Sequence, residues 1–193
     1  MINKNFRIFI TGHKGLVGSA VFNLLKKKKF KKIITADRKK LNLLDTNKVY
    51  NFIKKKNINI KINCAAKVGG ILANSSYPVE FLYENIQMQN NLLLAAKKNK
   101  IKRFIFLGSS CIYPRDSKTP ITEDKLLTGI LEKTNEAYAL AKISGIKLSE
   151  YLFYENNMDI VCLMPTNIYG LKDNYDKFSG HVIPGMISKF IEA

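Results

Sequence analysis

A tyrosine and a lysine spaced four positions apart could form a catalytic pair. Tyr138 and Lys142 lie within residues 136–155, whose pattern predicts a helix, and positions i and i+4 of a helix share one face. An ammonium group near a phenol hydroxyl favours the phenolate, so we expect Lys142 to lower the pKa of Tyr138. For an isolated pair, two polar residues that merely share a helix face are the commoner explanation. The surrounding sequence has to decide between the two.

Two more reactive side chains precede this pair. Ser109 and Cys111 lie in the run Leu107-Gly108-Ser109-Ser110-Cys111-Ile112-Tyr113-Pro114, directly after the apolar stretch at residues 103–107. A short apolar stretch of this kind predicts a buried strand, which would place both side chains at its carboxyl end. With the pair downstream, they offer a phenol, a cation, a hydroxyl and a thiol to one site. Taken alone, Cys111 would more often be a small buried apolar residue.

The elements that position these residues alternate between strands and helices. Short apolar runs, each followed by a longer amphipathic stretch, predict an α/β fold of the Rossmann type, a doubly wound parallel sheet with helices on both faces. We expect residues 160–164 to form a short buried strand. The predicted strands are residues 7–11, 32–36, 60–64, 103–107 and 160–164, and the predicted helices are residues 16–25, 46–55, 78–98, 136–154 and 182–193.

A glycine-rich turn joins the first predicted strand to the first predicted helix. Its three glycines, Gly12, Gly15 and Gly18, follow each other at intervals of three. Glycines permit a tight turn and a close approach of the backbone to a ligand, and the N-terminus of a helix favours a pyrophosphate. An ordinary glycine-rich turn is the alternative, but the strand before it and the helix after it favour a dinucleotide site.

The residues after the second strand give conflicting signals about the dinucleotide. Asp37 follows the glycine turn at about the distance, roughly 20 residues, at which an acid holds the ribose 2′-hydroxyl of NAD. Its neighbour Arg38, helped by Lys14, could instead accommodate the 2′-phosphate of NADP, and both could be ordinary loop charges. At the end of the third strand, Asn63 and Ala65 belong to a run of small residues that suits a close approach of the cofactor, although small residues also pack helices on sheets.

Composition limits the remaining function classes. The 193 residues are enough for one domain with a real core, and no apolar run approaches the roughly 20 residues of a membrane span. The net charge of +17 is almost all lysine and is spread along the chain, so compositional drift explains it more simply than a nucleic-acid role. Three widely spaced cysteines suggest neither a disulfide framework nor a metal site. No secretory signal is evident, and we expect a cytoplasmic protein.

Longer runs carry a resemblance to a known family. The glycine turn, Asn63-Cys64-Ala65-Ala66 and Ser109 with the Tyr138/Lys142 pair resemble the extended short-chain dehydrogenase/reductase superfamily. Within it, the sequence is similar to the GDP-L-fucose synthase family, the GDP-4-keto-6-deoxymannose 3,5-epimerase/4-reductases. The matching runs extend over almost the whole chain; besides the run around Ser109 they are Ala66-Lys67-Val68-Gly69-Gly70-Ile71, Thr134-Asn135-Glu136 and Met164-Pro165-Thr166-Asn167-Ile168-Tyr169-Gly170.

The resemblance implies an enzyme that epimerises GDP-4-keto-6-deoxy-D-mannose at C3 and C5 and then reduces C4 with NADPH, which we favour over NADH. Tyr138 would donate a proton to the C4 oxygen, Ser109 would hydrogen-bond that oxygen, and Lys142 would tune Tyr138 and hold the nicotinamide ribose. Cys111 and His181 match the residues that move protons at C3 and C5, and modest tuning would bring both near neutral pH. A homodimer through the helices at 78–98 and 136–154 is also implied.

The resemblance further assigns residues to the cofactor and the substrate. Lys189 stands where the family often has an arginine for the substrate phosphates, and lysine keeps the charge without the bidentate fork. With those discussed above, the candidate cofactor-binding residues are Gly12, Lys14, Gly15, Leu16, Val17, Gly18, Arg38, Asn63, Ala65, Leu107, Gly108, Ser109, Ser110, Tyr138, Lys142, Pro165, Thr166, Asn167, Ile168 and His181.

The resemblance also bears on domain organisation and leaves two alternatives. Residues 1–181 would form the cofactor-binding catalytic domain and residues 182–193 the start of a substrate-binding region, most of which we expect to be missing. One alternative is another nucleotide-sugar epimerase or dehydratase, although a dehydratase typically has an Asp-Glu pair where Ser110 and Cys111 stand. The other is a dinucleotide-binding or nucleic-acid-binding protein without turnover.

Overall fold

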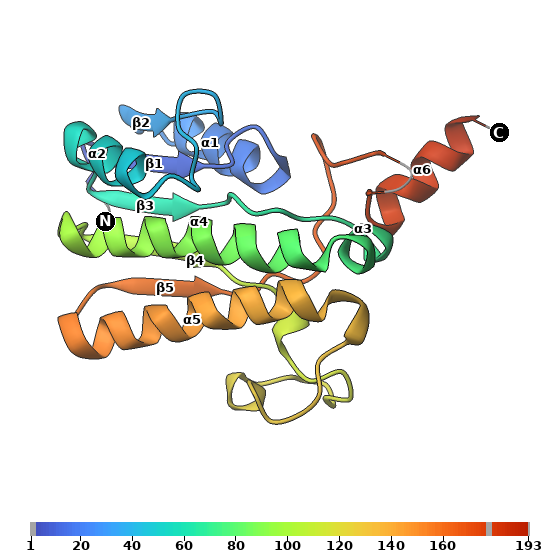
Figure 1. Ribbon diagram of the computed structural model, residues 1–193. Helices are drawn as coiled ribbons and strands as arrows, with labels where there is room; N and C mark the ends of the chain where they lie inside the picture. The colour runs from blue at the N-terminus through green and yellow to red at the C-terminus, as the bar shows by residue number, and fades with distance from the viewer. Residues whose placement is uncertain (1–2, 177–178, 193) are drawn as a thin grey trace.

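Five parallel strands form the centre of the molecule, as the sequence predicts (Figure 1). The computed structural model describes residues 3–176 and 179–192. The strands follow the spatial order β2-β1-β3-β4-β5, so the order reverses beside β1. In doubly wound sheets, ligands bind beyond the carboxyl ends of the strands next to such a reversal. The strands are β1 (Arg7–Thr11), β2 (Lys32–Thr35), β3 (Ile60–Asn63), β4 (Arg103–Leu107) and β5 (Ile160–Leu163).

Helices cover both faces of this sheet. On one face, α2 (Thr46–Lys56), α4 (Pro78–Lys98) and α5 (Glu136–Asn156) pack around a core that includes Phe9, Leu92 and Phe104. On the other face, α1 (Leu16–Lys27) packs its apolar side chains against the isoleucines of β1 and β3. The sequence therefore predicted the fold class and both faces of the sheet correctly.

The structure differs from the sequence prediction at two elements, α3 and β5. The short helix α3 (Ile71–Ser76) follows Gly70 and was not predicted, because six residues are too few to show a helical period. β5 forms where expected, but it is not a buried strand, since Val161 is 39% and Leu163 47% exposed. β5 lies at the edge of the sheet, and α5 covers only its other face.

The remaining elements lie beyond the carboxyl ends of the strands. Three short 3₁₀ helices, η1 (Ser110–Ile112), η2 (Glu123–Lys125) and η3 (Lys133–Asn135), occur between β4 and α5. α6 (Val182–Glu192) stands away from the sheet, on the side of α3 (Figure 1). Within residues 3–176 and 179–192, no helix combines the length and the apolar character that a membrane crossing requires.

Candidate functional site

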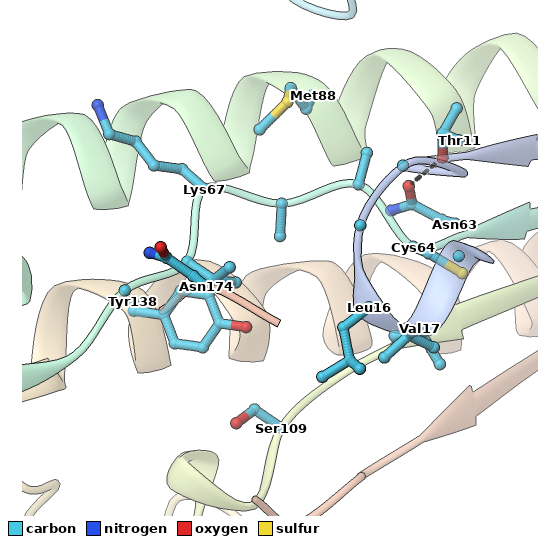
Figure 2. A pocket seen from close by; sticks show the side chains of 18 of the residues that line it. Thr11, Leu16, Val17, Asn63, Cys64, Lys67, Met88, Ser109, Tyr138 and Asn174 are labelled. Carbon is cyan, nitrogen blue, oxygen red and sulfur yellow. Dashed lines mark hydrogen bonds between the residues drawn. The ribbon is translucent and has the colours of Figure 1, made fainter. Parts of the chain in front are cut away.

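A cleft of about 690 Å³ opens beyond the carboxyl ends of β1, β3 and β4 (Figure 2). This volume lies within the usual range for small-molecule and cofactor sites. Every catalytic and cofactor-binding candidate from the sequence lines this cleft, although the candidates come from segments as distant as Gly12 and His181. The substrate candidate Lys189 does not line it, because it lies on α6, which stands apart.

The glycine loop forms one wall of the cleft. Gly12 has a φ of +69°, and a Cβ there would lie 2.5 Å from the carbonyl oxygen of Cys64. A Cβ on Gly18 would lie only 2.1 Å from the carbonyl oxygen of Gly12. Both positions therefore need glycine, and their contacts bring the start of α1 against the ends of β1 and β3. A helix N-terminus at such a position suits the pyrophosphate of a dinucleotide.

Charged side chains surround the end of the cleft beside β2. Asp37 accepts a hydrogen bond from the backbone N–H of Lys40 at 3.0 Å and lies 3.5 Å from Lys14 Nζ. The amide of Lys40 and, to a smaller extent, the charge of Lys14 hold the pKa of Asp37 below its usual value. The carboxylate is thus already occupied by this chain's own donors, while Arg38 lines the cleft beside it. Lys14 and Arg38 together fit a 2′-phosphate at this end.

Tyr138 and Lys142 project from α5 into the middle of the cleft, and both are largely buried. Lys142 Nζ donates a hydrogen bond to the carbonyl oxygen of Leu107 at 2.8 Å. The same ammonium lies 5.5 Å from the centre of the Tyr138 ring and 5.2 Å from that of Phe106. The cation therefore packs over the face of the phenol ring, and in Figure 2 the Tyr138 hydroxyl lies toward the side of Ser109.

The expected lowering of the Tyr138 pKa is wrong for this state of the protein. Burial raises the pKa of Tyr138 well above its usual value, and Cys111 raises it further. Burial also lowers the pKa of Lys142 to about 8, so the charge that was to stabilise a phenolate is itself destabilised. Spacing along a helix predicted the contact between the two residues, but it could not predict how much water each group loses.

Ser109 and Cys111 lie where β4 ends and η1 begins. The Cys111 thiol donates to Ser109 Oγ at 3.0 Å, and the backbone N–H of Cys111 points to the same oxygen at 3.4 Å. Burial raises the pKa of the Cys111 thiol, which outweighs the opposite effects of Ser109 and Lys142. The expectation that modest tuning would bring this thiol near neutral pH is therefore also wrong for this state.

His181 reaches the cleft from a segment far along the chain. The backbone N–H of Gly70 donates to the carbonyl oxygen of Ser179 at 2.9 Å, two residues before the histidine. A Cβ on Gly70 would lie 2.5 Å from the carbonyl oxygen of Gly180, so the backbones of these two loop segments are in direct contact. The sequence singled out the glycines at 69 and 70 only as part of a family run. The structure gives them a role in placing His181.

The cleft also contains an ion pair that the sequence did not predict. Lys67 Nζ lies 3.0 Å from a carboxylate oxygen of Glu84, and both residues line the cleft.

Among the described residues, three buried side-chain oxygens lack a hydrogen-bond partner, and all three belong to residues that line the cleft. Buried acceptors of this kind need donors from a ligand or from water. They are Asn74 Oδ1, Asn135 Oδ1 and Asp173 Oδ2.

Two solved structures superpose closely on this chain. The chain superposes on a GDP-L-fucose synthetase from Naegleria fowleri bound to NADP with a TM-score of 0.89 and 32% identity, over 100% of this chain and 64% of that one. It also matches a GDP-D-glycero-L-gluco-heptose synthase from Campylobacter jejuni in the presence of NADPH. That match has a TM-score of 0.93 and 31% identity, over 98% of this chain and 56% of the other.

Sequence relatives agree with the structural matches. The chain is 45% identical to the GDP-L-fucose synthase of Escherichia coli over 187 residues, which are 97% of this chain and 58% of that protein. It is 42% identical to GDP-L-fucose synthase 1 of Arabidopsis thaliana, over 100% of this chain and 60% of that protein. The chain thus spans about three fifths of the length of these relatives. Residues 8–193 match the model of one family across nearly the whole chain, and the chain belongs to the NAD dependent epimerase/dehydratase family.

Proposed function

We propose that this chain is the cofactor-binding and catalytic part of an NADPH-dependent GDP-L-fucose synthase, which acts on GDP-4-keto-6-deoxy-D-mannose. One observation carries the proposal: Ser109, Cys111, Tyr138, Lys142 and His181 line a single cleft whose far wall is a glycine loop. Identity of 45% with a GDP-L-fucose synthase over nearly the whole chain supports the same activity.

In the proposed reduction, bound NADPH supplies a hydride to C4 of the sugar. Tyr138 gives its hydroxyl proton to the C4 oxygen, and its raised pKa suits this role, because the proton is still present when the oxygen needs it. Ser109 donates a second hydrogen bond to that oxygen as negative charge develops there. Lys142, held by the carbonyl of Leu107, keeps a positive charge close to the reacting groups.

In the proposed epimerisations, Cys111 and His181 move protons at C3 and C5. A carbon next to a ketone loses its proton to a base on one face and regains a proton from an acid on the opposite face. A thiol and an imidazole that come from distant segments of the chain can face the sugar from different sides. The unpaired oxygens of Asn74, Asn135 and Asp173 would accept hydrogen bonds from a ligand rich in hydroxyl groups.

We also propose NADPH over NADH as the cofactor. Asp37 is occupied by Lys14 and the backbone of Lys40, whereas Lys14 and Arg38 present positive charge at the same end of the cleft. Two relatives solved with NADP or NADPH support this choice. Paired titrations with NADPH and NADH test this choice. Tighter binding of NADH would mean that Asp37, and not Arg38, sets the cofactor preference.

Domain organisation, assembly and location complete the proposal. Residues 1–181 would form the catalytic domain, and α6 with Lys189 would begin the region that binds the GDP-sugar. The exposed apolar side chains of α4 and α5, among them Tyr83, Leu94 and Leu140, suit a homodimer interface. The three cysteines are unpaired, which suits a reducing compartment such as the cytoplasm.

The test compares the chain alone with a chimera that carries the remaining C-terminal part of the Escherichia coli relative. NADPH binding is measured for both by fluorescence titration. Turnover is followed through NADPH oxidation, and epimerisation through deuterium uptake at C3 and C5 in heavy water. We expect both forms to bind NADPH and the chimera to perform both reactions. If the folded chimera neither oxidises NADPH nor exchanges these protons, the proposal is wrong.

A further inference from the structure

A lysine lies in the hydrophobic core beneath the cleft. Lys61, on the central strand β3, is 0% exposed. Its ammonium lies 4.6 Å from the centre of the Phe9 ring and 6.0 Å from that of Phe104. Lysine is almost never fully buried without partners, and burial here lowers the pKa of Lys61 well below its usual value. The position is therefore costly for the fold, and Lys61 does not line the cleft itself.

Lys61 donates two hydrogen bonds, one within its own strand and one to the end of β1. Its Nζ donates to the carbonyl oxygen of Ile62 at 2.8 Å and to Thr11 Oγ1 at 2.7 Å. A hydroxyl group has one hydrogen, and Thr11 uses it to donate to Asn63 Oδ1 at 2.7 Å (Figure 2). Because Lys61 donates to Thr11 Oγ1, the hydrogen of that hydroxyl points away from the lysine and toward the asparagine. The three side chains form one chain of hydrogen bonds that runs from the core to the cleft.

These linked hydrogen bonds determine which end of the Asn63 amide faces the cleft. Asn63 is 2% exposed and lines the cleft with Thr11. With its oxygen held by Thr11, the Asn63 nitrogen is turned away from Thr11, and this nitrogen donates to no other group in the described part of the chain (Figure 2). Without a donor on the far side of Thr11, the hydroxyl could rotate and the amide could turn its oxygen toward the ligand instead.

We propose that Lys61 is a positioning residue for the dinucleotide: through Thr11, it holds the Asn63 amide so that its N–H groups face the cofactor. The inference rests on the proposed function only in naming a dinucleotide as the ligand. Phosphate, ribose and carboxamide oxygens of a dinucleotide all accept hydrogen bonds, so an N–H donor at this position suits any of them. Space filling alone does not account for Lys61, because a methionine would fill the same volume without a buried amine.

The first test replaces Lys61 with methionine and follows NADPH binding and folding separately. We expect K61M to bind NADPH roughly five- to twentyfold more weakly, the size of one or two lost hydrogen bonds. Its resistance to urea in the absence of cofactor should equal or exceed that of the wild type, because a buried amine is removed. K102M is the matched control, since Lys102 also packs over a phenylalanine ring, Phe6 at 5.0 Å, but is exposed and outside the cleft.

A second variant interrupts the same linked hydrogen bonds at Thr11, which lines the cleft. T11V removes the hydroxyl, and we expect it to weaken NADPH binding by a similar factor. The double variant K61M/T11V should bind no more weakly than either single one, because both interrupt the same chain. In the cofactor-free protein, the side-chain amide signals of Asn63, identified by their loss in N63L, should shift in both single variants but not in K102M.

The outcomes separate this inference from the proposed function. If the wild type does not bind NADPH, the proposed function fails, and the Asn63 signals still decide whether Lys61 orients the amide. If the wild type binds and K61M binds equally well, Lys61 is not a positioning residue. The same conclusion follows if K61M loses affinity only in proportion to a loss of folding stability, or if the effects of K61M and T11V add. Should K61M fail to fold, unchanged NADPH binding or unchanged Asn63 signals in T11V would overturn the proposal, because the proposed hydrogen bonds run through Thr11.

Discussion

At the scale of single residues, burial removes most of the water around Tyr138 and Lys142. Lys142 has a pKa of about 8 in the folded protein against about 10.5 when exposed. Below pH 8 the amine is protonated in both states, and the folded state bears the full cost of the buried charge. Between these two values the unfolded state binds the additional proton, so this cost falls as the pH rises. Tyr138 and the thiols, whose pKa values are raised, act in the opposite direction above about pH 9.

A pH series can isolate this effect. We expect the free energy of unfolding of the cofactor-free wild type, minus that of K142M, to rise by about 1 kcal/mol between pH 7.5 and 9. Urea unfolding at several pH values measures the difference, and subtraction of K142M removes most of the contribution from the thiols. A difference that stays constant across this range would show that Lys142 is not destabilised by burial. K102M provides the baseline for an exposed lysine.

The two proposed chemistries should separate at single residues. In the chimera, we expect C111A to slow deuterium uptake at C3 and C5 by roughly 100-fold or more, while Y138F leaves the first exchange intact. Y138F should instead slow NADPH oxidation by a similar factor, because no proton reaches the C4 oxygen. C111A should bind NADPH like the wild type, because Cys111 is not among the candidate cofactor-binding residues. Equal losses of exchange and oxidation in both variants would contradict separate roles for the two residues.

Residue types and spacing predicted which side chains meet, but not their energies. The cleft contains all the expected catalytic and cofactor residues. Local pattern predicted the glycine turn, the strand ends and the shared helix face of Tyr138 and Lys142, whereas the family resemblance supplied His181. The pKa values of Tyr138 and Cys111 were misjudged, since desolvation depends on neighbours far away in the sequence. Lys61 was missed for a related reason: a lysine within an apolar strand gives no sign of being buried.

At the scale of elements, one glycine sets the position of α5. A Cβ on Gly145 would lie 2.5 Å from Phe106 Cζ and 2.8 Å from the amide of Gln89. That amide donates to the carbonyl oxygen of Ala141 at 2.6 Å and to Ser144 Oγ at 3.0 Å, which fixes α4 against α5. The close approach of both helices to β4 is what delivers Tyr138 to the end of the strand.

Substitution of this glycine tests the packing. We expect G145A to lower the free energy of unfolding by about 1–3 kcal/mol, the usual effect of overpacking, and to reduce kcat in the chimera by displacing Tyr138. The matched control is G185A in α6, where a new Cβ would meet nothing within 4 Å. That change should be neutral or stabilising by up to about 1 kcal/mol. Urea unfolding of both variants decides, and an unaffected G145A would mean that α5 can move without cost.

The positions of helices and strands were predicted more reliably than their burial. Strong local signals, such as Pro78 at the start of α4 and the glycine turn before α1, placed both helices correctly. The short helix α3 has no such signal beyond Gly70. For β5 the sequence predicted the strand but not its exposure, because a continuous apolar run does not reveal whether helices cover both faces of that strand.

At the scale of the whole molecule, the exposed apolar side chains of α4 and α5 make assembly testable. We expect the chain to sediment as a dimer at micromolar concentration and L94E or L140E to shift it to the monomer, because a charge buried in an apolar interface is costly. Leu94 and Leu140 are 44% and 43% exposed in the single chain. L127E, at an exposed site outside these helices, is the control. A dimer that survives both changes would exclude this interface.

The two edges of the sheet differ in chemistry. β2 begins at Lys32, next to Lys31; both lysines are exposed, and their repelling charges at this edge oppose the addition of a further strand. β5, at the opposite edge, is the uncharged run Ile160–Leu163, and two of its apolar side chains are half-exposed. Within the described residues, no further strand pairs with its outer side. Aggregation of this chain therefore has a preferred direction: strand addition would begin at β5, while β2 stays protected by its lysines.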